Sequence, residues 1–455
     1  MGEKVIAIFD IGKTNKKILL FNYDLKLVSE IEEKFAQIKD DDGFECDNIE
    51  LIEKWIMKSV MELIHSEIYE LTAVNFATYG ASLVYIDAEG RRLTPVYNYL
   101  KPVDEYLPEK LYKKHGGKDE FCRRTASPAL GMLNSGLQAF WLKTVKPEIF
   151  SNVKHILHFP QYLSYLLTGK IYSEHTSIGC HTALWDFDNM DYHPWVKEEG
   201  LIVPEPVAAD TLNEVVLDGK KIKVGIGIHD SSASLAPYFA AKTGKFLLVS
   251  TGTWCINMNP FNSEKLTAEQ LSKDCLCYMS ITKQPVKSSR LFLGHMHDTA
   301  VKKMSAYFKI NENSFSLIKP DLRLLNKMRV KFENDKIFIG QGDQSQEMKE
   351  DADLFAFDNF IEGYHQLLVE LSDLAADSIN LVISENDDTE NIYITGGFSK
   401  NLLFLKMIAS SFPDKKVFTS EISNATALGA ASIILNSLEQ DKSLLPDLGL
   451  IEVEL

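Results

Sequence analysis

The chain has 455 residues, of which 45% are hydrophobic and 25% charged, so it is globular in composition and too long for a single core. Its formal net charge of −16 argues against nucleic acid or an anionic membrane as the main partner. We find no signal peptide and no apolar run of about 20 residues that would span a bilayer. The six scattered cysteines indicate reduced thiols, and we expect a cytoplasmic protein.

The first half is predicted to alternate strands and helices. Apolar residues recur at helical spacing through 49–68, and Gly169 stands just past another helical segment, where a glycine typically ends a helix. The expected strands are 4–9, 17–22, 26–29, 73–77, 83–87 and 221–228, and the expected helices are 49–68, 137–146 and 160–168.

The second half begins with the same pattern as the first. A strand at 245–249, a glycine turn at 250–253 and a strand at 254–258 repeat the order found at 5–21, which predicts a duplicated domain. We therefore expect one domain over 1–242 and another over 243–455. Beyond this repeat we expect loops and short elements over 311–352, a strand at 393–395, and helices at 359–381, 401–411 and 425–435.

The turn between the first two strands contains Gly12-Lys13-Thr14, the end of a Walker A motif. A P-loop would need glycine where Ala7 stands and a helix after Thr14, but an apolar run follows Lys17 and predicts a second strand. Backbone N–H groups in a tight glycine turn can still hold an anion. We expect the two glycine turns to hold one polyphosphate from both sides, with hydroxyl donors Thr14 and Thr253 and added charge from Lys13 or Lys17.

Three further positions carry candidate chemistry. Asp230 follows a predicted strand, and it is either a helix N-cap or a general base that accepts a proton from a substrate hydroxyl. Asp10 is either a turn residue or a carboxylate that holds hydrated Mg²⁺. The glycines at 396–397 lie between a strand and a helix, where a flat ligand can approach the backbone. We interpret the histidine runs at 177–182 and 294–298 as structural rather than metal-binding.

Together these segments resemble the FGGY carbohydrate kinases of the actin-like ATPase superfamily, over roughly residues 4–440. Lys13 departs from the family pattern, which has a small residue or threonine at that position. The matching segments are 10–17 and 249–254 for the two phosphate motifs, 227–230 for the catalytic segment, 396–401 for the adenosine motif, 424–431 for the helix that follows it, and 150–169 in the central region.

The resemblance implies an α/β fold of two duplicated actin-like (ribonuclease H-like) domains, each a mixed sheet flanked by helices, with a cleft between them. It implies transfer of the γ-phosphoryl group of ATP, with Mg²⁺, to a hydroxyl of a small sugar, with Asp230 as the base and Asp10 holding Mg²⁺ through water. The implied ATP-binding residues are Gly12, Lys13, Thr14, Asn15, Lys17, Gly252, Thr253, Gly396, Gly397 and Asn401. The implied sugar-binding residues are Tyr79, Gly80, His229, Asp230 and Ser231.

The sugar is less well defined than the reaction. The sequences at 229–231 and 252–254 are most similar to the rhamnulose and fuculose kinases, which favours a 6-deoxy-ketohexose. Those enzymes carry an aspartate where this chain has Ser82, so kinases of xylulose, ribulose or glycerol stay open as alternatives. A sugar or nucleotide sensor without transfer activity also stays open as an alternative function. A homodimer stays open as an oligomeric state.

Overall fold

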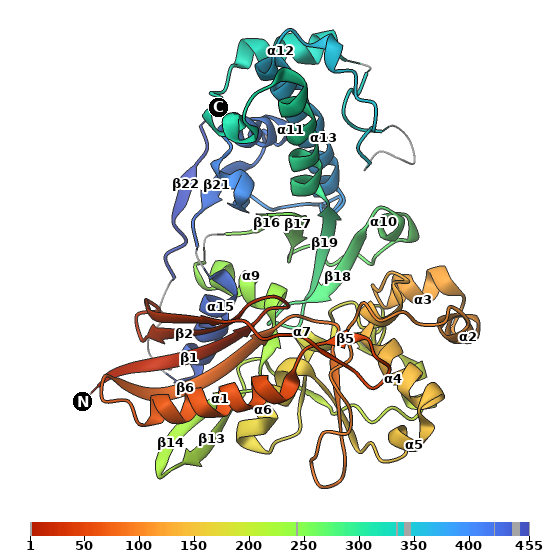
Figure 1. Cartoon of the computed structure of the whole chain (residues 1–455), viewed down its shortest axis with the longest axis vertical. Helices are drawn as coiled ribbons and strands as arrows, with labels where there is room; N and C mark the ends of the chain where they lie inside the picture. Colours follow the sequence, from red (N-terminus) through yellow and green to blue (C-terminus); the bar gives the residue numbers. More distant parts are fainter. Residues whose placement is uncertain are drawn as a thin grey trace.

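The computed structural model describes residues 2–242, 244–333, 335–340, 347–422, 424–438 and 446–454. Figure 1 shows two lobes, each built around a sheet of both parallel and antiparallel strands. The first seven-stranded sheet contains β1 (Glu3–Ile11), β2 (Lys16–Asn22), β3 (Leu27–Glu33), β6 (Tyr69–Thr78), β13 (Leu212–Leu217), β14 (Lys220–Gly225) and β15 (Ile228–His229). The second contains β16 (Phe246–Thr251), β17 (Cys255–Asn259), β18 (Cys275–Met279), β19 (Pro285–Leu291), β20 (Asn391–Gly396), β21 (Lys416–Ser420) and β22 (Leu450–Glu452).

The two sheets share one central plan. In the first, β1 pairs antiparallel with β2 and parallel with β6, and in the second β16 pairs antiparallel with β17 and parallel with β20. The opening glycine turn of each half is therefore a hairpin turn beside a parallel strand. The antiparallel pairing of β1 and β2 excludes the P-loop, as the sequence predicts.

Helices flank both sheets. Those before residue 242 are α1 (Ile49–Ile64), α2 (Tyr106–Lys114), α3 (Lys118–Arg124), α4 (Ser135–Val145), α5 (Pro147–Phe150), α6 (Phe159–Thr168), α7 (His175–Ile178), α8 (Pro194–Glu198) and α9 (Asp230–Ala240). Those after it are α10 (Ala268–Ser272), α11 (Leu293–Phe308), α12 (Leu322–Lys331), α13 (Phe360–Asn380), α14 (Leu402–Ser411) and α15 (Ala425–Leu438). Within the described residues, no helix has the length and apolar character that crossing a membrane requires.

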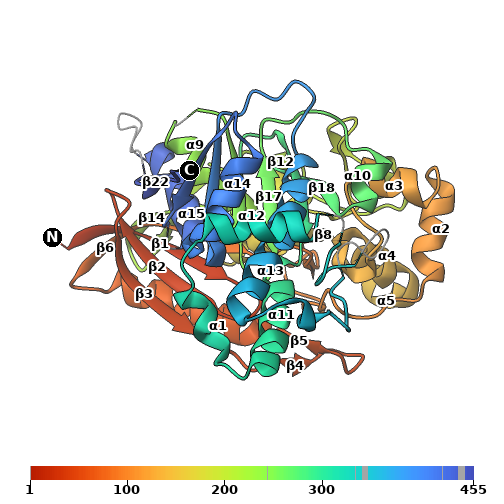
Figure 2. The ribbon, with the colours of Figure 1, turned by 90° about the horizontal axis from the view of Figure 1, so that it is seen from above.

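Short strand pairs connect the larger elements. They are β4 (Ile38–Lys39) with β5 (Glu45–Cys46), β7 (Leu83–Ile86) with β8 (His155–His158), β9 (Ser173–Glu174) with β12 (Pro206–Val207), and β10 (Trp185–Asp186) with β11 (Asp191–Tyr192). Helices α2 to α5 lie to one side of the first sheet in both Figure 1 and Figure 2.

Three expected boundaries are wrong. The helix predicted over 49–68 ends at Ile64, because the chain must turn before β6 starts at Tyr69. The strand predicted over 221–228 is split into β14 and β15, since Gly227 has a positive φ of 81° that no regular strand contains. The stretch 311–352 holds a ten-residue helix, α12, whose single buried stripe is too narrow to show in its polar sequence.

The last helix of the second half packs on the first sheet. In both views α15 lies beside β1 and β2, and Leu428 and Ile434 share a buried cluster with Ile6 and Ile8. Gly429 permits the close crossing of α15 and α9, since a Cβ there would lie 1.9 Å from the carbonyl oxygen of Ala233. The two halves are therefore joined by a shared core.

Candidate active site

Thr251 connects the glycine turn at 252–254 with the turn at 396–397, which resembles the adenosine motif. Its Oγ1 donates to the carbonyl oxygen of Thr395 (2.5 Å) and accepts from the N–H of Phe398 (3.0 Å). Gly396 has φ 86°, and a Cβ there would lie 1.7 Å from the Thr251 carbonyl oxygen, so only glycine fits. The turns at 252–254 and 396–397, predicted separately, thus form one rigid unit.

A cavity of about 730 Å³ opens beside this unit. Four of the predicted ATP-binding residues line it, namely Gly252, Thr253, Gly397 and Asn401. They come from β-turns and helix starts that are more than 140 positions apart in the chain, so the sequence alone could not show that they meet. Gly397 faces open space, as no atom lies within 4 Å of a Cβ built there.

The structure adds cavity wall residues that sequence reasoning did not find. Asn401 Nδ2 donates to the hydroxyl of Tyr364 (2.9 Å), which lies 3.2 Å from His297 Nε2. Burial lowers the pKa of His297, so its imidazole is neutral near pH 7. His297 belongs to one of the histidine runs interpreted as structural, and here it both packs in the core and lines the cavity.

Asp230 is the first residue of α9, and His229 is the N-cap. The Asp230 carboxylate nevertheless bonds a backbone N–H of the first turn, as a capping side chain does, so its role as a base stays a prediction. Its Oδ1 accepts from the N–H (2.6 Å) and hydroxyl (3.2 Å) of Ser231, and burial raises its pKa to about 6. The side chain is 32% exposed, so the carboxylate is still open to a reactant.

A second carboxylate, Asp10, lies within electrostatic reach of Asp230. Burial raises the pKa of Asp10 to about 7, and the charge of Asp230 adds to this effect, while Lys17 opposes it. Lys17, opposite Asp10 in the hairpin, is itself paired with Glu30 at 2.7 Å. Two neighbouring carboxylates that repel one another in this way fit a divalent cation.

The predicted sugar loop follows β6. A Cβ on Gly80 would lie 3.1 Å from Cys180 Sγ and 3.2 Å from the imidazole of His229, so this glycine lets three segments close on one another. His229 Nε2 lies 3.1 Å from Cys180 Sγ, and burial lowers its pKa to about 4. The run 177–182, which the sequence left without a role, therefore lies beside the candidate sugar site.

Tyr79 connects this loop to the first glycine turn. Its hydroxyl donates to Asp47 Oδ2 (2.7 Å), and the same oxygen accepts from Lys13 Nζ (2.7 Å). In the turn itself, Thr14 is exposed and the Oδ1 atom of Asn15 is buried without a hydrogen-bond partner in the protein. Asp47 was not predicted as a site residue, since nothing in its local sequence shows that the chain brings it to Lys13.

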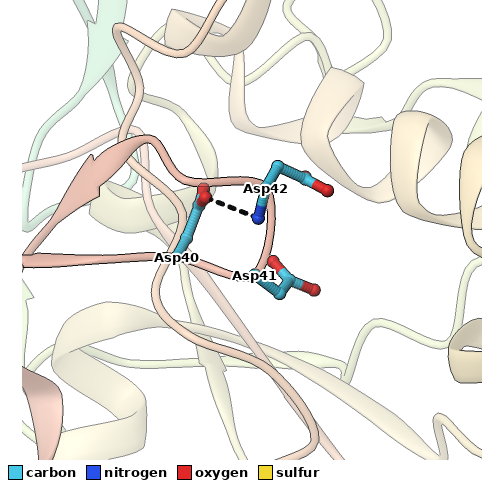
Figure 3. A group of neighbouring side chains, drawn as sticks. All are labelled: Asp40, Asp41 and Asp42. Carbon is cyan, nitrogen blue, oxygen red and sulfur yellow. Dashed lines mark hydrogen bonds between the residues drawn. The ribbon is translucent and has the colours of Figure 1, made fainter.

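Three consecutive aspartates near this site could be mistaken for a metal centre. Figure 3 shows Asp40, Asp41 and Asp42 grouped at the β4–β5 turn. Lys101 donates to Asp40 (2.6 Å) and Asp42 (2.5 Å), and Lys146 to Asp41 (2.7 Å) and Asp42 (2.8 Å). These two lysines balance two of the three carboxylate charges and fix the turn that precedes Asp47.

The fold has two lobes that share one central plan, and glycine turns from two remote segments meet beside one cavity. Residues 5–203 match the model of the N-terminal domain of the FGGY family of carbohydrate kinases, and residues 243–326 match the model of its C-terminal domain. The chain belongs to the FGGY family, and it is a sugar kinase.

Solved structures show the same fold over nearly the whole chain. A carbohydrate kinase from Novosphingobium aromaticivorans is 23% identical with a TM-score of 0.81, covering 100% of this chain and 95% of its own. A xylulose kinase from Lactobacillus acidophilus is 16% identical with a TM-score of 0.75, and the match covers 97% of this chain and 91% of that protein. A gluconate kinase from the same organism is 16% identical with a TM-score of 0.72, and the match covers 98% of this chain and 91% of that protein.

Proposed function

We propose that the chain transfers the γ-phosphoryl group of ATP to a hydroxyl of a small ketose, with Asp230 as the general base. The observation that carries this is the meeting of two remote turns, at 252–253 and 397–401, in one cavity. That cavity has the size of a small-molecule site and its walls supply backbone N–H groups and aromatic rings, as a nucleotide requires.

In this proposal Asp230 accepts the proton of the attacking hydroxyl. The sugar oxygen forms a bond to the γ-phosphorus while the bond from that phosphorus to the bridging oxygen of ADP breaks, and ADP leaves. The N–H groups of the two glycine turns donate to the phosphate oxygens as charge shifts among them. The neutral imidazole of His229 and the Ser231 hydroxyl position the carboxylate through their contacts with it.

Asp10, together with Asp230, would hold Mg²⁺ through water. When bound, the ion would neutralise phosphate charge and lower the pKa of both carboxyls, which burial raises in each case. The unpartnered Oδ1 of Asn15 offers a further acceptor for a water molecule in the same turn.

A 6-deoxy-ketohexose is our first candidate for the acceptor. It is supported by the sequences at 229–231 and 252–254. Ser82 weakens this assignment, and kinases with quite different acceptors share the fold. A panel of L-rhamnulose, L-fuculose, D-xylulose, D-ribulose, D-gluconate and glycerol, each tested for acceptor-dependent ADP release, identifies the acceptor.

The test of the mechanism is Asp230→Asn. Asparagine keeps the shape but accepts no proton, so we expect kcat to fall by about 10²–10⁴-fold. The affinity for MgADP, measured by calorimetry, and the melting temperature should stay near wild type, because asparagine keeps an Oδ1 that accepts from the N–H of Ser231. Turnover near the wild-type value would rule out Asp230 as the base and favour a non-transferring sensor.

A further inference from the structure

Lys13 stands where the family has a small residue or threonine, and it belongs to a buried ionic cluster. Asp47, 5% exposed, accepts from Lys13 Nζ through Oδ2 (2.7 Å) and from Lys16 Nζ through Oδ1 (3.0 Å). Lys16 Nζ also donates to the carbonyl oxygen of Lys13 (2.9 Å), and the Tyr79 hydroxyl donates to Asp47. The cluster therefore fixes both the backbone and the side chain of Lys13.

The two lysines of this cluster differ in exposure. Lys16 is 2% exposed at its side chain, so its ammonium stays with Asp47 and the Lys13 carbonyl oxygen. Lys13 is 23% exposed and has donor capacity left after its bond to Asp47. Two lysines against one carboxylate leave a net charge of +1, and Lys13 is the member that can present it to a ligand.

The position of the Lys13 ammonium is toward the sugar loop. It lies 5.1 Å from the ring centroid of Tyr79 and 5.3 Å from that of Tyr99. Tyr79 directly precedes Gly80, which packs on His229 beside the candidate base. The charge of Asp230 contributes to raising the pKa of Tyr99, after burial and Asp47, so the two groups lie within electrostatic range of each other.

From this arrangement we infer that Lys13 is a specificity-determining residue for the acceptor sugar, and that Asp47 is the positioning residue that holds it there. The inference rests on the proposed kinase function, and it moves Lys13 from the ATP phosphates, where the sequence places it, to the acceptor. The Lys13 ammonium donates a hydrogen bond to an oxygen atom of the acceptor sugar. Because the ammonium is charged, this hydrogen bond is charge-assisted and roughly twice as strong as one between neutral groups.

A ligand that drew Lys13 away from Asp47 would have to break this ion pair. Burial alone would raise the pKa of Asp47, but the hydrogen bond and charge of Lys13, with help from Lys16 and Tyr79, hold it below its usual value. Removing Lys13 from this nearly buried carboxylate is therefore unfavourable. An acceptor oxygen can bind the free donor positions of Lys13 with the ion pair intact.

The experiment compares Lys13→Met, Lys13→Arg and Asp47→Asn with wild type. Methionine keeps the apolar stem without the charge, arginine keeps the charge, and asparagine releases Lys13 while it leaves Lys16 in place. Each variant is titrated with MgADP and with MgATP by calorimetry, and kcat and KM are measured for each acceptor of the panel that wild type phosphorylates. Melting curves check that each variant is folded.

We expect Lys13→Met to raise the acceptor KM at least about tenfold, the loss of one charge-assisted hydrogen bond, with nucleotide affinity within about twofold of wild type. Arginine should recover part of the loss, and Asp47→Asn should raise KM as well. If Asp47→Asn does not fold, the two Lys13 variants decide.

Two results would overturn the inference. A tenfold loss of MgATP affinity with an unchanged acceptor KM in Lys13→Met places the lysine at the nucleotide. An unchanged KM in folded Asp47→Asn shows that Asp47 does not position it. Failure of wild type to phosphorylate any acceptor is a different outcome, because it removes the proposed function and the inference with it.

Discussion

At the residue scale, Asp10 makes stability depend on pH. Its folded-state pKa of about 7 lies above the usual 3.8, so the folded state binds this proton more tightly than the unfolded chain does. The carboxyl therefore contributes stability that is complete below about pH 4 and is lost as the pH rises to about 7. This window is the opposite of that for a carboxylate stabilised by an ion pair.

Asp10→Asn should remove the loss of stability that the ionisation of Asp10 causes as the pH rises. With Mg²⁺ chelated, we expect the melting temperature of the variant, relative to wild type, to be higher at pH 8 than at pH 5. Added Mg²⁺ at pH 8 should then raise the melting temperature of wild type more than that of the variant, because the ion binds the ionised carboxylate.

The control for this pair of measurements is Asp24→Asn, an exposed aspartate in the turn between β2 and β3. It should shift the melting temperature equally at both pH values. If Asp10→Asn behaves like this control, Asp10 is not the proton-binding group.

At the scale of elements, we predict that Gly396 is needed for the two turns to pack together, whereas Gly397 leaves space for the ligand. A Cβ at Gly396 would lie 1.7 Å from the Thr251 carbonyl oxygen at a positive φ, whereas a Cβ at Gly397 meets no atom within 4 Å. Gly396→Ala should therefore lower the melting temperature and stop the two turns from docking, at a cost of about 2 kcal/mol or more.

Gly397→Val should instead fold with a melting temperature near wild type. Its side chain would enter the cavity that Gly397 lines, so MgADP affinity should fall while sugar binding without nucleotide is kept. Calorimetry with MgADP and with sugar, together with melting curves for both variants, checks this contrast. Equal nucleotide affinity of Gly397→Val and wild type would contradict a nucleotide role for this cavity.

The elements also show what the sequence could predict. The β1–β2 hairpin and the repeat at 246–259 follow from local alternation and glycine turns, and both are confirmed. The strands β18 and β19 were not predicted, because nearly all of their residues are buried and show no alternation. Contacts such as Lys13 with Asp47, or Cys180 with His229, depend on chain segments more than 30 positions apart and have no local signal.

At the scale of the whole molecule, the division of the chain into two halves differs from the division of the structure into two cores. The duplicated pattern predicts a division near 242, and each sheet takes its strands from one side of that point. Helix α15 nevertheless comes after β21 of the second sheet and covers the first sheet, where Ile433, Ile434 and Leu435 are buried with Leu19 and Phe21. Asn75 Nδ2 adds a buried hydrogen bond to the carbonyl oxygen of Ala430 (3.0 Å).

A fragment of residues 1–242 should therefore not fold into a stable monomer by itself. Without α15, the face of the first sheet that carries Ile6, Ile8 and Leu19 would be in water, and each fully buried side chain of this kind is worth about 1.5–3 kcal/mol. We expect the fragment to aggregate or to bind a hydrophobic dye, and we expect co-expression of residues 243–455 to rescue it. A longer chain of residues 1–438 retains α15 and is the control that should stay folded. A fragment 1–242 with a cooperative melt and no dye binding would mean that α15 adds little to the first core, and that the two halves are joined by the cleft contacts alone.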